Sequence, residues 1–205
     1  MNPNKIVLFL LLLISFTSCN NDQIRNKKSD EDYLEALGRM DPQLTDHFPS
    51  KIITTNYSTH YVKKVENNEV YLIHYVYNVS DNDLKSARRF TRSKSIAHYN
   101  ANDSCLLIIN RNETKQDSLI MDSNCYIDKV PVPRFKDVIH PQSSNYIKLN
   151  SNYVLYVIEA NSKDFYRTYN LKPNESMPNN WKNGYSKGIA INEKEKTIIY
   201  WITIW

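Results

Sequence analysis

Glycine is nearly absent from this chain, with three residues among 205, at positions 38, 184 and 188. That shortage excludes the glycine-rich loops that hold phosphate groups in nucleotide-binding folds, and the G-x-S-x-G turn of α/β-hydrolases. Cysteine also occurs three times and never as C-x-x-C, which excludes a redox motif of that type and the paired cysteines of structural zinc sites. The composition therefore indicates no cofactor.

Histidine, the other common metal ligand, is sparse. The five histidines are His47, His60, His74, His98 and His140. None forms H-E-x-x-H and no two are four residues apart, so we expect no metal site of the known spacing types. His60 and His74 could face each other across a hairpin, but two ligands do not make a site, and we expect ordinary sheet histidines.

The chain has no large excess of charge of either sign. Lysine and arginine number 26 against 22 acidic residues, a net charge of +4 with a pI near 8.8, which does not indicate nucleic-acid binding. A hydrophobic content of 41%, with 12% aromatic residues, excludes a disordered chain. Fifteen tyrosines suit strands with one solvated face.

The one long apolar run, Ile6 to Phe16, is too short to span a bilayer and is followed by Thr17, Ser18 and Cys19. This order resembles the signal peptide and lipobox of bacterial lipoproteins, although Phe16 stands where that family usually has an aliphatic residue. The resemblance implies removal of residues 1–18 and acylation of Cys19, as with palmitate. The alternative is an ordinary secretory signal with a coincidental cysteine.

Several expectations follow from the resemblance and from the composition of the processed chain. Residues 19–30 form a flexible tether, and residues 31–205 form one domain. Asn20 follows the cysteine where an inner-membrane retention signal has aspartate, which favours the outer membrane, with the domain facing the periplasm or the cell surface, as in Bacteroidota-type lipoproteins. The membrane is then a partner through the N-terminal lipid, and an oxidising compartment favours a disulfide between Cys105 and Cys125 over two buried thiols.

Hydrophobic patterns predict an α+β domain built on a mainly antiparallel sheet, with seven or eight strands and one or two helices. The predicted helices are 32–40, with Tyr33, Leu34 and Leu37 on one face, and 81–99. The predicted strands include 57–65 paired with 70–79, 105–110 paired with 118–121, 153–160, and 188–192 paired with 197–205. Strands 70–79 and 197–205 are apolar on both faces, so we expect them to be covered on both sides.

Two surface features are candidate binding sites. Lys85, Arg88, Arg89 and Arg92 form a cationic stripe on the second helix, suited to anionic lipid headgroups or acidic glycans, or simply a solvated face. Trp181 and Tyr185 lie in an asparagine-rich loop. An aromatic ring flanked by amides suits stacking on a sugar or gripping a partner protein, whereas packing of Trp181 over the core explains it equally.

Catalytic signals are weak, and we assign no catalytic residue. Glu159 at the end of an apolar strand, with Asp164 nearby, could act as an acid if burial raised its pKa; pairing with lysine or arginine is the alternative. Ser186 and Lys187 are neighbours on a strand, so their side chains point to opposite faces. The sequence favours a non-catalytic binding or accessory module of the cell envelope, contacting a partner protein, polymer or glycan. The alternatives are an envelope hydrolase and a purely structural role.

Overall fold

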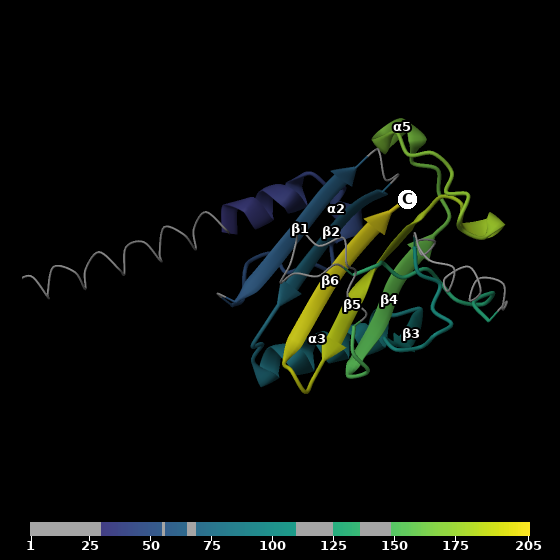
Figure 1. Ribbon diagram of the computed structural model, residues 1–205. Coiled ribbons are helices and arrows are strands. Elements are labelled where there is room, and N and C mark those ends of the chain that lie inside the picture. The colour runs from purple at the N-terminus through teal and green to yellow at the C-terminus, as the bar shows by residue number, and fades with distance from the viewer. Residues whose placement is uncertain (1–29, 55, 65–68, 110–124, 136–148) are drawn as a thin grey trace, which may run out of the picture.

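The computed structural model describes residues 30–54, 56–64, 69–109, 125–135 and 149–205. These residues form one six-stranded antiparallel sheet in the order β1-β2-β6-β5-β4-β3 (Figure 1). The strands are β1 Tyr57–Lys64, β2 Glu69–Val76, β3 Ala97–Asn100, β4 Tyr153–Asn161, β5 Tyr185–Asn192 and β6 Thr197–Ile204. The helices are α2 Pro42–Thr45, α3 Asp81–Lys94, α5 Tyr166–Tyr169 and the 3-10 turn η2 Asn179–Trp181, with a further helix over residues 30–38. The predicted α+β class is confirmed.

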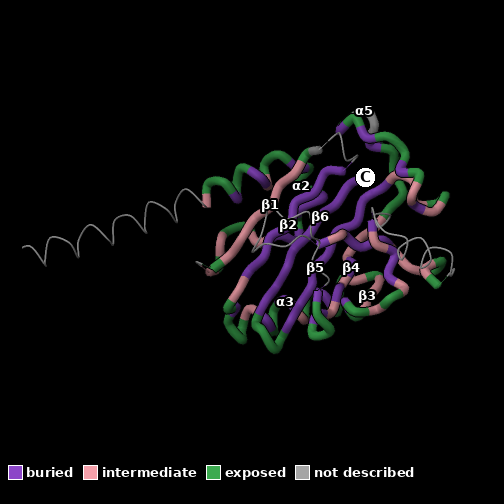
Figure 2. The backbone as a smooth tube through the Cα atoms, viewed as in Figure 1, coloured by how far each residue is buried: buried purple, intermediate pink, exposed green. Residues whose placement is uncertain are grey.

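The middle of the sheet is buried on both faces. Every residue of β2, β5 and β6 is buried, as Figure 2 shows. β6 pairs with β2 on one side and β5 on the other. Each face of the sheet packs against a separate layer. This explains why the strands predicted at 70–79 and 197–205 carry apolar residues on both faces.

One layer is helical. The helix over residues 30–38, α2 and α3 pack on one face, and α2 and α3 lie behind the sheet in Figure 1. Tyr33, Ala36 and Met40 are the buried side chains of the first segment, whereas Leu34 is 50% exposed. The predicted apolar face was therefore partly wrong, because the helix turns Tyr33 and Ala36, three residues apart, toward the sheet.

The second helix is shorter than predicted. Ser80 caps α3, accepting a hydrogen bond from the Asp83 amide at 3.2 Å, and the helix ends at Lys94 where Ser95 adopts an extended conformation. The amide of Ile96 then donates to the carbonyl of Val157 at 2.9 Å. The expected helical residues 97–99 instead belong to β3, which pairs with β4, because a sheet edge was available to bond their backbone.

The opposite layer is irregular. A strand was predicted at 105–110, but residues 105–109 form none. They pack over the sheet and meet the 130–133 segment through a parallel bridge between Ile108 and Val132. Val132 donates to Leu107 at 2.9 Å and accepts from Ile109 at 3.0 Å. Prolines at 131 and 133 lack amide hydrogens, so the contact cannot extend into a ladder. The predicted partner strand, 118–121, lies outside the described residues.

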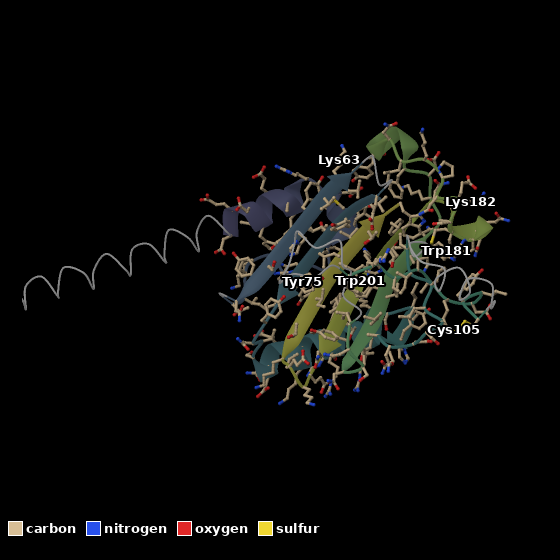
Figure 3. All side chains as sticks on the ribbon, in the orientation of Figure 1. Lys63, Tyr75, Cys105, Trp181, Lys182 and Trp201 are labelled. Carbon is tan, nitrogen blue, oxygen red and sulfur yellow. A yellow bond between two sulfur atoms is a disulfide. The ribbon has the colours of Figure 1, made fainter. Side chains whose placement is uncertain are left out.

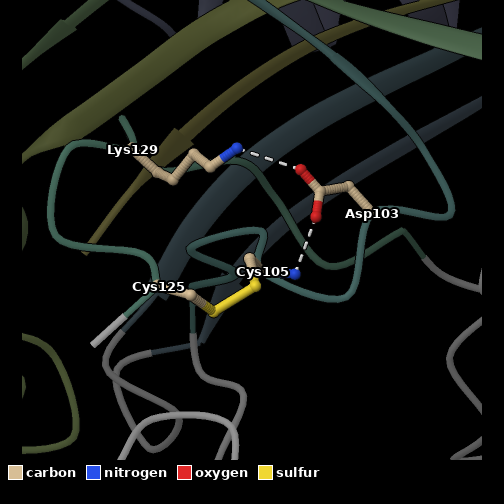
Figure 4. Close-up of a disulfide and its surroundings, with 4 residues drawn as sticks. All are labelled: Asp103, Cys105, Cys125 and Lys129. Carbon is tan, nitrogen blue, oxygen red and sulfur yellow. Dashed lines mark hydrogen bonds and ion pairs between the residues drawn. A yellow bond between two sulfur atoms is a disulfide. The ribbon is translucent and has the colours of Figure 1, made fainter. Parts of the chain in front are cut away.

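A disulfide joins Cys105 to Cys125 in this irregular layer (Figure 4). Asp103 organises the surrounding turn, since its carboxylate accepts from the Cys105 amide at 2.8 Å and pairs with Lys129 Nζ at 3.0 Å. The predicted signal, Cys19 and the predicted tether up to residue 29 lie outside the described part of the chain, whereas Asp30, the last residue of that tether, belongs to the first helix. Within that part, no helix is long and apolar enough to cross a membrane.

Candidate binding cleft

A buried lysine lies at the centre of a polar cluster on the helical face. Lys187 is 3% exposed although it belongs to the otherwise largely apolar strand β5. Its ammonium group lies 2.9 Å from Asp46 Oδ1 and 3.0 Å from Glu159 Oε2, and it donates to the Gln43 carbonyl at 2.7 Å. All three ammonium hydrogens therefore have acceptors, which is what burial of a charged amine requires.

Local structure places these partners. Asp41 caps α2 by accepting from the Gln43 amide at 2.9 Å, and Pro42 is the first residue of the helix. The helix ends at Thr45, and Asp46 directly follows it. On the sheet, the register of β4 against β5 shifts between Val157 and Glu159, which leaves Glu159 opposite Lys187. Two distant carboxylates thereby reach the same ammonium group.

Glu159 is thus an ion-pair partner, the alternative that the sequence left open. Burial opposes ionisation of Glu159, but hydrogen bonds from Tyr185 and Lys187 outweigh it and hold the pKa of this carboxyl below its usual range. The raised pKa required for a general acid is not what this environment produces. Asp164 is exposed.

His47 adjoins the cluster and is buried, with 1% of its side chain exposed. Its Nε2 lies 2.9 Å from the carbonyl of Trp201, so Nε2 carries the hydrogen and donates. Burial lowers the pKa of His47 to about 4, which keeps the ring neutral at pH 7. The remaining nitrogen, Nδ1, has no hydrogen-bond partner and lies 3.7 Å from Asp46 Oδ1. As an unprotonated ring nitrogen it is an acceptor.

A cleft of about 290 Å³ opens beside this cluster, between the 46–53 segment and α3. Ile189 and Tyr200, cross-strand neighbours on the sheet, also line it. Ile53 and Phe90 are 39% and 38% exposed at its walls. The full lining is Asp46, His47, Pro49, Ile53, Asp83, Ser86, Ala87, Phe90, Ile189 and Tyr200.

Asp83 brings a second carboxylate to this cleft. Its Oδ2 accepts from the Ser80 hydroxyl at 2.5 Å. Burial, and then the charge of Asp83, raise the pKa of Tyr200 to about 12, so the phenol keeps its proton. The cleft therefore combines apolar and aromatic walls with two acids.

The predicted cationic stripe lies on another side of α3. Arg88 pairs with Glu193 at 2.9 Å, and Lys85 and Arg88 line a separate hollow with Asp81. Lys85, Arg89 and Arg92 are exposed. The stripe is therefore partly neutralised at Arg88 and does not contribute to the cleft.

Trp181 and Tyr185, the predicted aromatic binding residues, do not form a flat exposed surface on which a sugar could stack. Trp181 is half-buried, with its ring centroid 6.2 Å from that of Trp205, whose indole nitrogen donates to the Trp181 carbonyl at 2.7 Å. Tyr185 is buried edge-on against Phe165 and donates to Glu159. Figure 3 labels Trp181 beside Lys182, at the end of the sheet that Figure 1 marks with C and away from α3.

The histidine pair of the first hairpin points to opposite faces. His74 pairs in register with Thr59 and shares a 2.9 Å hydrogen bond with its hydroxyl, whereas His60 pairs in register with Ile73 and bonds to Ser58. They therefore do not face each other across the hairpin, the arrangement that the sequence had left open. Among the described residues, no group of three histidine, cysteine or acidic side chains could hold a metal ion.

Sequence reasoning did not find the cleft. Lys187 precedes the apolar run 189–191 on the same strand, which was a usable signal, since a lysine buried there requires an anion. Asp46, His47, Asp83 and Phe90 carried no comparable signal. Comparison of the chain with protein-family models, with curated proteins and with solved structures finds no match.

Proposed function

We propose that this protein is a lipid-anchored lipoprotein of the outer membrane whose domain is a non-catalytic binding module, and that it contacts a partner protein through the cleft beside α3. The observation that carries the proposal is the cleft wall. Ile53 and Phe90 are two of the few large apolar side chains that the described surface exposes, and they flank the same opening. Exposed apolar groups around a hollow are typical of interaction sites.

The chemistry of the neighbouring cluster favours binding over hydrolysis. A general acid or base works best when its pKa lies near the operating pH. His47, with a pKa of about 4, is neutral at pH 7, Glu159 is held ionised, and Tyr185 has its pKa raised to about 12 by burial and then by Glu159. Tyr185 and Lys187 bind Glu159, and His47 donates to the Trp201 carbonyl, so each group is held by a structural partner.

The anchor rests on the lipobox-like sequence that ends at Cys19. Acyl chains add about 0.8 kcal/mol of membrane affinity per buried methylene, so multiple chains would hold the domain firmly at a bilayer. Metabolic labelling with an alkyne analogue of palmitate tests this part. We expect label on the wild-type protein and none on Cys19→Ser, which would also leave the membrane fraction. A labelled Cys19→Ser variant would contradict the anchor.

Site-specific photo-crosslinking in the native cell tests the binding module. A photoreactive amino acid at position 90 should trap a defined protein, whereas the same group at position 92, exposed on α3 but outside the cleft lining, should not. A third probe at position 182 tests the loop that contains Trp181. Crosslinks from position 182 alone would assign the binding function to that loop. The absence of a crosslinked protein at all three positions would refute the proposal.

A further inference from the structure

We propose that the occupant of the cleft is a cationic side chain, a lysine ammonium or an arginine guanidinium, projecting from the partner protein. This inference rests on the proposed function, because it assigns the chemistry of the partner that the cleft would bind. It comes from three independent features of the lining, namely its charge, its unpartnered acceptor and its aromatic walls.

The charge of the lining has one sign. Asp46 and Asp83 contribute carboxylates, and no lysine or arginine is among the described residues that line the cleft. Lys187 pairs with Asp46 and neutralises part of this charge. Because Lys187 also pairs with Glu159, the surroundings of the cleft retain net negative charge. The Asp46 side chain is 65% exposed, which leaves its carboxylate accessible beside the lysine contact. An anionic ligand would meet repulsion here.

The unpartnered acceptor is His47 Nδ1. A buried polar atom without a hydrogen-bond partner costs stability unless another group satisfies it. Because Nε2 already donates to Trp201, Nδ1 can only accept from an incoming donor while the ring is neutral. This nitrogen is buried behind the cleft surface, and Asp46, the carboxylate that would bind the cation, lies 3.7 Å from it through Oδ1.

The walls suit the rest of a long basic side chain. Phe90 and Ile53 offer apolar surface on which methylene groups pack, and the Phe90 and Tyr200 rings offer π faces that attract a cation. A cleft of about 290 Å³ is at the small end of the range for small-molecule sites, which suits a single side chain. The rest of the partner would then cover the exposed rims at Ile53 and Phe90.

The first experiment tests the chemistry with small probes and the full-length protein in detergent. Butylammonium and butylguanidinium chlorides are titrated while backbone amide NMR shifts of residues 83–90 are followed, with butanol and butyrate as neutral and anionic controls. We expect saturable shifts from the two cations alone. Equal shifts from butanol, or tighter binding of butyrate, would overturn the inference.

Matched variants locate the interaction. Asp83→Asn should weaken binding of the cations about tenfold, a loss typical of a hydrogen bond to a charged group. Asp81→Asn removes an acid from the same helical turn, but Asp81 lines the separate hollow with Lys85, so binding should be unchanged. Cation binding that survives Asp83→Asn unchanged would show that the cleft is not the site.

The second experiment separates a partner's side chain from a free amine. Ser86→Lys places a tethered cation inside the cleft, while Asn82→Lys places one on an exposed part of the helix outside the lining. We expect Ser86→Lys to abolish the crosslink from position 90 and Asn82→Lys to keep it. A crosslink that persists in both would leave the binding module standing and overturn the cationic occupant. Cation binding with no crosslinked protein would identify a free amine as the ligand and overturn the partner.

Discussion

Lys187 Nζ lies 2.9 Å from the Asp46 carboxylate, although 141 positions separate the two residues in the sequence. The contact fastens the segment after α2 to strand β5, and a second contact with Glu159 extends it to β4. His47 directly follows Asp46, so the same ion pair positions the inner wall of the cleft. Removing the lysine should therefore affect both stability and binding.

Lys187→Met should lower the free energy of unfolding by about 1–3 kcal/mol. Loss of one partner from a buried ion pair costs about 3–5 kcal/mol, but the side chains of Asp46 and Glu159 are 65% and 47% exposed and can be rehydrated. Urea denaturation at pH 7 measures the change. Lys182→Met is the control, since Lys182 forms an ion pair with a largely exposed Glu175 and should change stability by less than about 0.5 kcal/mol. Equal effects of the two substitutions would contradict this account of the cluster.

His47 should make the protein sensitive to mild acid. Its pKa is about 4 in the folded protein against 6.5 unfolded, so below pH 6.5 the unfolded chain binds more protons. The contribution to stability is complete above pH 6.5 and is lost as the pH falls toward 4, on the order of 3 kcal/mol in total. His74, whose pKa burial lowers to about 3, acts in the same direction.

The measurement is the free energy of unfolding from urea titrations between pH 5 and 7.5, above the range where Asp46 and Glu159 protonate. His47→Gln keeps an amide donor for the Trp201 carbonyl and removes the titrating ring, so we expect a shallower fall in stability. His98→Gln, at an exposed position of β3, should keep the wild-type slope. A His47→Gln profile parallel to wild type would refute the assignment.

Gly188→Ala should prevent stable folding, because a methyl group there would lie 2.2 Å from the carbonyl oxygen of Tyr156 and 2.4 Å from the Trp201 ring. Both neighbours are fixed within the sheet. Gly38→Ala meets nothing within 4 Å and replaces a helical glycine, so it should stabilise the protein by up to about 1 kcal/mol. Thermal unfolding of both variants, followed by circular dichroism, checks the contrast. A well-folded Gly188→Ala protein would show that the sheet can separate there.

Reduction of the Cys105–Cys125 bond should cost about 3 kcal/mol, the chain-entropy value for a loop of 20 residues. The described residues of the irregular layer show few backbone hydrogen bonds beyond those between 107–109 and Val132, so we expect the covalent link to contribute much of its order. We expect a reductant to lower the midpoint of urea unfolding in the wild type. The Cys105→Ala/Cys125→Ala variant should start at the lower midpoint and show no response to reductant. A wild-type midpoint that ignores the reductant would argue against this role.

The sequence predicted the structure best for strands that are buried along their whole length. The apolar faces of β2 and β6 predicted covered central strands, and the apolar runs 188–192 and 197–205 predicted the hairpin of β5 and β6. It failed at 97–99, where helix and strand patterns agree over a few residues and only the sheet edge decides. The strand predicted at 105–110 failed because an apolar run can equally fill a layer without pairing.

The cleft was beyond sequence reasoning for a geometric reason. Its polar groups come from the segment after α2, from α3, and through Lys187 from β5, and no local spacing connects them. The Trp181 interpretation shows the converse: a loop that looks exposed in sequence has its aromatic ring packed on Trp205. Sites assembled from distant segments become visible only once the sheet order is known.

That order has a consequence for how the chain matures. β6 lies between β2 and β5, yet it follows every other strand in the sequence. During synthesis or export from the N-terminus, the β1–β2 hairpin and the β3–β4 pair emerge before β6, each with an unpaired edge and an uncovered apolar face. They cannot join until residues 197–204 arrive. A nascent chain of this protein therefore remains a client for chaperones until its last strand inserts.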